Sequence, residues 1–450
     1  MARAARPRER LTAADASNIV IDAPDQVNVF LMAGVLGPGG PVAPDGAVDL
    51  VAVRRAIAAI VPAMPRLSQR VVPEGRRFAW DTVPLDLEQH VRLVEPVAGR
   101  AGFEALCARL MVTPLPLDLP LWELLLVPGV APARVGMVLR IQHAMADGLA
   151  AVRLVERLLR PDGMADAAVP TDGAVPTDGA MPTDGVPPTS AAAPADAARP
   201  PPAASRRTLR ARLRTLASGW ERTVAILRPV VPRTVLLGPI GPQRGVAFVD
   251  APLESLAAGA ATAGATVNDA LLSAMAAAAE AALRDRGEPV PPVLPVSVPV
   301  ALGERGRSGN AVGVMLVPLP TGEPDAARRL RLVAESTRER KADARARGSF
   351  ELTRTRVGTR VFARFVRYQR LIVMFATNVP GPRHPLALAG APLERAWPLA
   401  AIQGNVRLGV AALSYAGVLG CAVHCDADAL SADVVAAALA DEFARIAALA

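Results

Sequence analysis

The residue best suited to acid–base chemistry is His143, which lies in the segment 142–148, QHAMADG. An imidazole has an unperturbed pKa of about 6.5, so it can take a proton from an alcohol near neutral pH. Asp147 can hold the segment through an arginine or through backbone amides, and Gly148 permits tight packing or a positive φ. Taken by itself, the segment is equally compatible with a histidine that is buried and fully hydrogen-bonded.

The flanking sequence predicts that this segment is a loop between a strand and a helix. Residues 135–141 form an apolar run typical of a buried strand, and residues 149–160 have apolar side chains at helical spacing on one face. Pro161 ends the helix. A loop in this position can present the His143 side chain to a bound substrate.

Three cysteines, Cys107, Cys421 and Cys425, do not indicate a disulfide framework. Cys421, His424 and Cys425 could be imagined as metal ligands, but a fourth ligand is missing nearby, and residues 417–425 form an apolar strand pattern. We therefore expect buried thiols rather than a metal site.

Other catalytic motifs are absent from the sequence. It contains no Gly-x-Ser-x-Gly, no His-Glu-x-x-His and no Cys-x-x-Cys, and its only lysine, Lys341, is followed by alanine, which excludes a Walker loop. These absences argue against a serine hydrolase of that type, a zinc hydrolase and a nucleoside triphosphatase.

The chain carries a net charge of +8, which favours anionic partners, and almost all of its positive side chains are arginines. Nucleic acid, anionic lipid and phosphorylated cofactors such as coenzyme A all fit that charge. With 3% aromatic residues and no nucleic-acid-binding motif, we rank nucleic acid last.

No apolar run reaches the roughly 18 residues of a membrane span, and no secretory signal follows the basic N-terminus. We therefore expect a cytoplasmic protein.

The length of 450 residues predicts two domains separated by a linker. Residues 161–204 contain three Pro-Thr-Asp-Gly units and an Ala/Pro run, a composition typical of disorder. We expect one lobe at residues 1–160, a linker at 161–204 and a second lobe at 205–450. Residues 205–233 have an apolar stripe flanked by arginines, which is compatible with a helix at a lipid surface or with one packed on the second lobe.

The remaining pattern mixes helices and strands and so predicts an α/β fold with mixed sheets. A helix should begin near Thr266, where Asp269 completes a capping box, and a last helix should begin at Ser431. Further elements are expected as strands at 293–300, 312–319, near Ile372 and at 406–412, and as a charged helix at 325–345.

The segment around His143 resembles the HHxxxDG motif of the wax ester synthase/diacylglycerol acyltransferase family, within the coenzyme A-dependent acyltransferase superfamily. Further blocks of that family follow in its usual order, namely Pro120-Leu121-Trp122, residues 238–242 (GPIGP), Asn268-Asp269, Pro295-Val-Ser297, Gly309-Asn310, residues 378–382 (NVPGP) and 413–417 (LSYAG). Together they cover most of the chain outside the linker.

The resemblance implies a two-lobed fold like that of chloramphenicol acetyltransferase, with the active site at the lobe interface. It also implies fatty acyl transfer from acyl-CoA, a substrate rather than a bound cofactor, to a lipid alcohol such as diacylglycerol or a fatty alcohol. His143 would be the general base and Asn268, at a helix N-terminus, the oxyanion donor. No metal is implied, and contact with the inner membrane face or lipid inclusions would suit such substrates.

Several further site residues follow from the same resemblance. Asp147, Gly148 and Gln142 would support the catalytic loop, and Pro120, Leu121, Trp122 and Asn378 would contact substrate. The sequence departs from the family at two positions, because Gln142 replaces the first histidine and Val27-Asn28 replaces an early Met-His pair. A condensation enzyme that uses carrier-bound substrates and a lipid-binding relative without activity therefore remain as alternatives.

Overall fold

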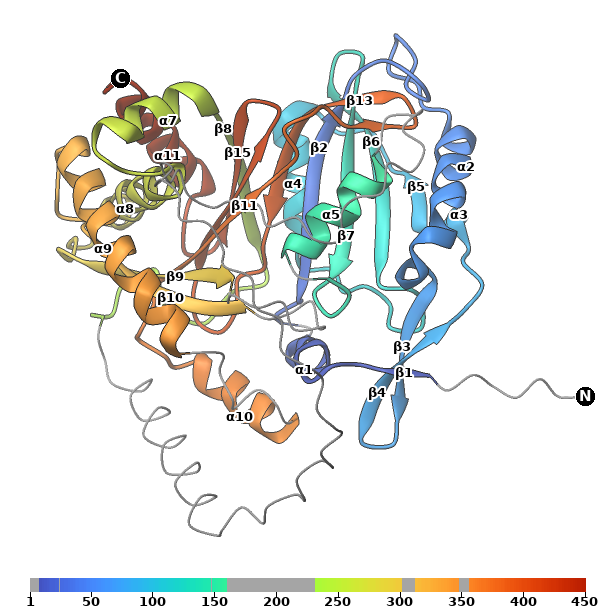
Figure 1. The fold of residues 1–450 in the computed structure, drawn as a ribbon, viewed down its shortest axis with the longest axis horizontal. Coiled ribbons are helices and arrows are strands. Elements are labelled where there is room, and N and C mark those ends of the chain that lie inside the picture. Colours follow the sequence, from blue (N-terminus) through green and yellow to red (C-terminus); the bar gives the residue numbers. More distant parts are fainter. Residues whose placement is uncertain (1–7, 24, 147, 160–230, 302–311, 348–355) are drawn as a thin grey trace, which may run out of the picture. The chain divides into compact units, whose positions relative to one another are not determined.

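Two six-stranded sheets organise the protein, and strands from both ends of the chain contribute to the first (Figure 1). The computed structural model describes residues 8–23, 25–146, 148–159, 231–301, 312–347 and 356–450. These described residues all belong to one compact unit. The expected linker at 161–204, and all of the stripe at 205–233 except its last three residues, lie outside them.

The first sheet has the strand order β12-β13-β2-β7-β6-β5. Its members are β2 (Val29–Leu36), β5 (Val91–Leu93), β6 (Trp122–Ala131), β7 (Arg134–Gln142), β12 (Ala387–Leu388) and β13 (Ala391–Leu399). Strand β13 comes from late in the chain and pairs antiparallel with β2, with Trp397 opposite Ala33. Local sequence patterns do not predict this pairing.

Alternation along β2 divides its side chains between two apolar clusters. Leu31 and Ala33 face helix α4 (Gly99–Leu110), whereas Met32 and Leu36 face α2 (Leu50–Ile60) and α5 (Gly148–Leu158). This period of two is the one expected of a strand that is buried on both faces. Since β7 and α5 pack in the same apolar cluster, the elements on both sides of the turn between them are held in place.

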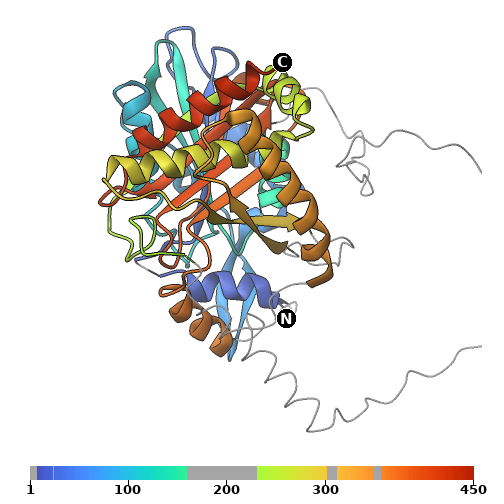
Figure 2. The ribbon, with the colours of Figure 1, turned by 90° about the vertical axis from the view of Figure 1, so that its left-hand side faces the viewer.

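The second sheet has the order β10-β9-β11-β14-β15-β8, with both parallel and antiparallel pairs. Helices α8, α9 and α11 cover it in the foreground of Figure 2, and α7 joins the same apolar core. The elements are β8 (Arg244–Pro252), α7 (Leu253–Thr262), α8 (Val267–Asp285), β9 (Leu294–Ala301), β10 (Val312–Leu319), α9 (Ala326–Arg347), β11 (Met374–Pro380), β14 (Leu408–Tyr415), β15 (Val418–Asp426) and α11 (Ala432–Ala447).

A small sheet, β1-β4-β3, and several short elements complete the described residues. They are β1 (Glu9–Arg10), α1 (Ala13–Ile21), the short helices η1 (Val61–Ala63) and η2 (Pro65–Ser68), β3 (Gln69–Glu74), β4 (Arg77–Thr82), α3 (Leu87–His90) and α10 (Arg356–Val366). No described helix is both long and apolar enough to span a bilayer.

The predicted mixed α/β fold is confirmed, and two strand positions need correction. The strand predicted near Ile372 begins at Met374, because the Gln369 side chain accepts hydrogen bonds from the amides of Leu371 and Ile372 at 2.8 and 3.0 Å. The strand predicted at 406–412 begins at Leu408, since the Val406 amide donates to the Gln403 carbonyl in a turn.

The Cys421–His424–Cys425 group is not arranged as a metal site. Cys421 and Cys425 point into the core of the second sheet, whereas His424 is one residue out of phase with them on β15. The His424 Nδ1 instead bonds the Ala400 carbonyl oxygen at 2.7 Å. The expectation of buried thiols is confirmed for Cys107, Cys421 and Cys425.

Candidate functional site

Residues 142–145 form a tight turn at the end of β7, which we call the catalytic turn for the role predicted for His143. The amide of Met145 donates to the carbonyl of Gln142 at 2.9 Å, and the amide of Ala144 donates to the Gln142 side-chain oxygen at 2.5 Å. The side chain of Gln142, at the end of the strand, therefore helps to close the turn. The turn lies where the sequence predicts a loop between strand and helix. His143 itself is partly exposed, and its ring meets the Phe30 ring edge-on with centroids 5.7 Å apart.

Two asparagines hold the backbone of His143 from both sides. The His143 amide donates to the carbonyl of Asn28 at 3.1 Å, and the Asn18 side chain donates to the carbonyl of His143 at 3.2 Å. Asn18 and Asn28 are also bonded to each other, because Asn28 Nδ2 donates to Asn18 Oδ1 and to its carbonyl. The main chain of the candidate base is thus fixed independently of its ring.

Gln142 is fully buried behind His143. Its Nε2 donates to the Asn18 carbonyl at 3.2 Å and to Asp22 Oδ2 at 3.3 Å. Burial raises the pKa of Asp22 above its ordinary value, and the hydrogen bonds from the Asn28 amide and from Gln142 partly offset that rise. The two departures noted in the sequence, Asn28 and Gln142, are therefore neighbours in one network of amides.

The other predicted support residues are only partly described. Gly148 is the first residue of α5, immediately after the catalytic turn. Asp147 lies outside the described residues, so its proposed role in holding the loop stays a prediction.

The Pro120-Leu121-Trp122 block is buried at the start of β6. Leu121 accepts a hydrogen bond from the Gln142 amide at 3.0 Å, which ties the block to the catalytic turn. Trp122 donates from Nε1 to the Leu67 carbonyl at 2.8 Å and stacks on His90 with centroids 4.8 Å apart. These contacts are with the protein's own core, and contact with substrate stays a prediction for all three residues.

Asn268 lies in the first turn of α8, which has the capping box predicted from the sequence. Thr266 Oγ1 accepts from the Asp269 amide at 3.3 Å, and Asp269 Oδ2 accepts from the Thr266 amide at 2.9 Å. Asp269 Oδ1 also accepts from Thr337 on α9 at 2.6 Å. With Asp269 occupied by the cap, Asn268 is the neighbouring residue whose partly exposed side chain can serve a ligand.

The structure brings Asn268 together with Asn378 of β11, another predicted site residue. Asn378 Nδ2 donates to Asn268 Oδ1 at 3.5 Å, a long hydrogen bond in which Asn268 is the acceptor and its Nδ2 group takes no part. Asn268 and Asn378 belong to the second sheet and its helices, whereas His143 belongs to the first. Contact between the two halves is provided where α5 packs near Val379 of β11.

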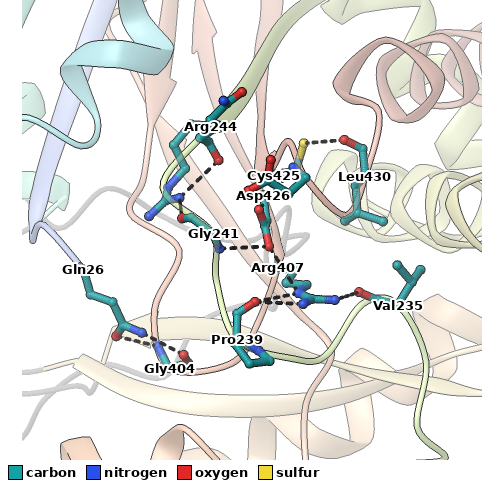
Figure 3. A network of polar contacts seen from close by, with 12 residues as sticks. Gln26, Val235, Pro239, Gly241, Arg244, Gly404, Arg407, Cys425, Asp426 and Leu430 are labelled. Carbon is teal, nitrogen blue, oxygen red and sulfur yellow. Dashed lines mark hydrogen bonds and ion pairs between the residues drawn. The ribbon is translucent and has the colours of Figure 1, made fainter.

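The GPIGP segment at 238–242 is held by an arginine and an aspartate of the second sheet (Figure 3). Arg407 donates to the Pro239 carbonyl at 2.8 and 3.0 Å and pairs with buried Asp426 at 3.2 Å, while the Gly241 amide donates to Asp426 Oδ2 at 3.2 Å. A Cβ at Gly238 would lie 2.7 Å from the guanidinium carbon of Arg407. Arg407 and Asp426 therefore hold the motif against the second sheet, and a side chain at position 238 would displace the Arg407 guanidinium.

Two surface hollows lie elsewhere in the described structure. One, of about 600 Å³, is lined by residues 128–134 and by Asp45, Gly46 and Gly99 at the opposite end of β7 from His143. A smaller one is lined by Asp250, residues 394–396, Tyr415, Val418 and Gly420. Neither contains a predicted site residue, and we assign no role to either.

Sequence reasoning missed three residues around His143, namely Asn18, Asp22 and Gln403. Gln403 donates from Nε2 to Asn28 Oδ1 at 2.7 Å across 375 positions of sequence. In the sequence, this region was indicated only by Val27-Asn28, which replaces the family's early Met-His pair. Within the described residues, no group of three or more His, Cys, Asp or Glu side chains could hold a metal ion.

Comparisons with known proteins identify the family of the chain. The profile of the "wax ester synthase/diacylglycerol acyltransferase catalytic domain" matches residues 11–271, and that of the "WS/DGAT C-terminal domain" matches residues 308–447. A Mycobacterium tuberculosis protein named "Probable diacyglycerol O-acyltransferase" is 28% identical, over 98% of this chain and 96% of its own length.

Solved structures show the same fold. The wax ester synthase/diacylglycerol acyltransferase from Marinobacter aquaeolei VT8 superposes with a TM-score of 0.69 at 19% identity, covering 97% of this chain and 98% of that one. The first condensation domain of the CDA synthetase has a TM-score of 0.58 at 17% identity, covering 98% and 96%. The two-lobed acyltransferase fold implied by the motifs is confirmed, and the chain belongs to the wax ester synthase/diacylglycerol acyltransferase family.

Proposed function

We propose that this protein transfers a fatty acyl group from acyl-CoA to the hydroxyl group of a lipid alcohol, with His143 as general base. The observation that carries the proposal is the fixed main chain of His143 at the β7–α5 turn, in a chain whose family is defined by this chemistry. A base must be held within hydrogen-bond reach of the proton it removes, and this turn is held by buried amides.

The reaction proceeds by direct displacement. His143 takes the hydroxyl proton while the alcohol oxygen bonds the thioester carbonyl carbon, which gives a tetrahedral intermediate. The C–S bond then breaks, and the imidazolium returns the proton to the departing thiolate, so the products are an ester and free coenzyme A. No acyl-enzyme forms, and both substrates must be bound together.

Asn268 is the proposed oxyanion donor. The N-terminus of α8 favours negative charge through the helix dipole, and Asn378 lies beside the Asn268 side chain. An anion forming at this point would be stabilised more than the neutral thioester carbonyl that precedes it, and this difference lowers the barrier.

The acceptor is a diacylglycerol or a long-chain alcohol, and both substrates dissolve in lipid. We place contact with an anionic lipid surface on α10 and on the turn after it, which holds Arg367 and Tyr368. Residues 352–370 contain six arginines and no acidic residue. Arg360, Arg364, Arg367, Val361 and Tyr368 are exposed, and the two apolar side chains are 43% and 69% accessible. Arginines beside exposed apolar groups are typical of a helix that lies at a headgroup layer.

Helix α10 is also close to the catalytic turn. It packs on α1, the helix that supplies Asn18 to His143, and Arg367 pairs with Asp25 at 2.6 Å just beyond α1. A lipid surface at α10 would therefore bring apolar substrates near the site. The stripe at 205–233 lies almost wholly outside the described residues, and its contact with a lipid surface stays a separate prediction.

The test is release of coenzyme A thiol from palmitoyl-CoA with and without diacylglycerol or hexadecanol, with product identification. Release that depends on the alcohol, together with the matching ester, supports the proposal. No release with any alcohol would indicate a binding protein, and activity with carrier-bound acyl groups alone would indicate a condensation enzyme.

A further inference from the structure

Residues 400–407, which we call the crossover segment, connect β13 of the first sheet to β14 of the second. One side chain of this segment, Gln403, reaches back to the catalytic turn. Its Nε2 donates to Asn28 Oδ1 at 2.7 Å, a short and well-formed hydrogen bond. The segment that joins the two sheets is therefore bonded to the residue that holds the His143 amide.

Asn28 is 1% exposed, and all of its polar groups are engaged. Its amide donates to Asp22 Oδ1 at 2.9 Å, its Nδ2 donates to Asn18, its carbonyl accepts from His143, and its Oδ1 accepts from Gln403. A buried carbonyl oxygen that loses its donor is costly, so the side chain would turn to find another partner. Because these bonds share one residue, such a rotation would also move the His143 main chain.

The crossover segment is itself anchored, so Gln403 is presented from a fixed position. Gly404 exchanges two hydrogen bonds with the Gln26 side chain, at 2.8 and 3.0 Å (Figure 3). Asn405 exchanges two with Gln369, both at 2.8 Å. Gly404 has φ +69°, and a Cβ there would lie 2.8 Å from the Val366 carbonyl, so glycine is required for this bend.

We propose that Gln403 is a positioning residue for acyl transfer, a role that rests on the proposed function of His143. Gln403 touches no reacting atom. Through Asn28 it fixes the peptide of His143, and Asn18 completes the hold on the other side. The amides at Asn28 and Gln142, which stand where the family has histidines, are thereby joined to the crossover segment in one hydrogen-bonded unit.

The experiment compares Gln403→Met, which removes the donor at similar size, with Gln26→Ala, which loosens the same segment without touching Asn28. Both are assayed in the full chain with palmitoyl-CoA and hexadecanol. We expect Gln403→Met to lower kcat roughly tenfold, with KM for palmitoyl-CoA within twofold of wild type, because alignment is lost and ground-state binding is not. The pH midpoint of kcat/KM should not move. Gln26→Ala should lower kcat much less than Gln403→Met does, because the Gln369–Asn405 bonds still anchor the segment and the Gln403–Asn28 bond is kept.

Two results would overturn the proposal. One is a wild-type kcat for Gln403→Met. The other is that Gln403→Met and Gln26→Ala lose kcat to the same extent and melting temperature to the same extent, which would show that the segment only stabilises the fold. If Gln403→Met does not fold, Gln403→Glu, which keeps the shape but cannot donate when ionised, carries the same test. His143→Ala, assayed in parallel, separates this proposal from the proposed function, since full activity there refutes the function whatever Gln403 does.

Discussion

His143 owes its proposed role to contacts of its backbone as much as to its imidazole. Its amide and carbonyl are bonded to Asn28 and Asn18, and its ring lies against Phe30. A base that is held in this way loses little orientational freedom when the substrate arrives. Gln142 cannot titrate, so the hydrogen bonds it makes to Asn18 and Asp22 are unaffected by its own protonation.

The local motif allowed His143, Gln142 and Asn268 to be predicted, because each lies beside a recognisable strand end or helix cap. Asn18, Asp22 and Gln403 could not be predicted in this way. They meet His143 or its neighbours only after folding, and the Gln403–Asn28 bond spans 375 positions. Nothing in the spacing of these residues distinguishes them from ordinary polar residues.

The proposed oxyanion donor, Asn268, can be tested by a single substitution. Asn268→Asp keeps the shape of the side chain but places a carboxylate where the oxyanion should form. We expect kcat to fall by about 10²–10³, the usual cost of losing one oxyanion donor. The control is Thr337→Val, which breaks the contact with Asp269 at the same helix start and should lower the melting temperature while leaving kcat near wild type. Equal kcat losses in both variants would assign the effect of Asn268→Asp to the helix cap.

At the scale of elements, β15 carries a buried histidine outside the site. Burial lowers the pKa of His424 to about 4, against an ordinary value of 6.5. Its Nδ1 bonds the Ala400 carbonyl at the start of the crossover segment, and its Nε2 has no hydrogen-bond partner among the described residues. The unfolded chain therefore takes up a proton below pH 6.5 that the folded chain refuses until about pH 4.

This difference predicts acid-sensitive stability. As pH falls from 7.5 to 5, His424 should cost about 2 kcal/mol of unfolding free energy, since the unfolded state binds more protons over that range. His424→Gln, which cannot be protonated, should lose correspondingly less stability over the same range in denaturant titrations. His384→Gln, at an exposed position, is the matched control. The same pH dependence in wild type and His424→Gln would show that His424 is not the group responsible.

Helix α10, together with Tyr368 in the turn that follows it, provides a second prediction for an element. Arg364→Glu with Tyr368→Ser should reduce binding to vesicles of phosphatidylglycerol and phosphatidylcholine at least roughly tenfold, because each arginine near an anionic surface contributes about 1 kcal/mol. The matched control is Val51→Ser with Arg55→Glu on α2, where an exposed apolar side chain and an arginine have the same four-residue spacing. Figure 1 places α2 well apart from α10.

Three results would count against the α10 surface. They are undiminished binding of the α10 variant, an equal loss in the α2 control, and unchanged binding of wild type as salt rises, since exposed charges are screened at high ionic strength. Co-sedimentation at two salt concentrations measures all three.

At the scale of the whole molecule, the class of fold and most of its elements were predictable, and the way they join was not. The capping box at Thr266, strand β10 at 312–319 and the N-cap at Ser431 were all predicted from local patterns. The pairing of β13 with β2 was not, because both strands are apolar and either could pair with many others. That pairing brings the crossover segment to the catalytic turn.

The proposed function depends on removal of the acceptor alcohol's proton by His143. The most direct measurement is the single-turnover rate of ester formation by His143→Ala, with palmitoyl-CoA and hexadecanol both saturating. We expect the rate to fall by about 10²–10⁴, the usual contribution of a general base, while the melting temperature stays near that of wild type. A folded His143→Ala protein that forms ester at the wild-type single-turnover rate would show that His143 is not the general base.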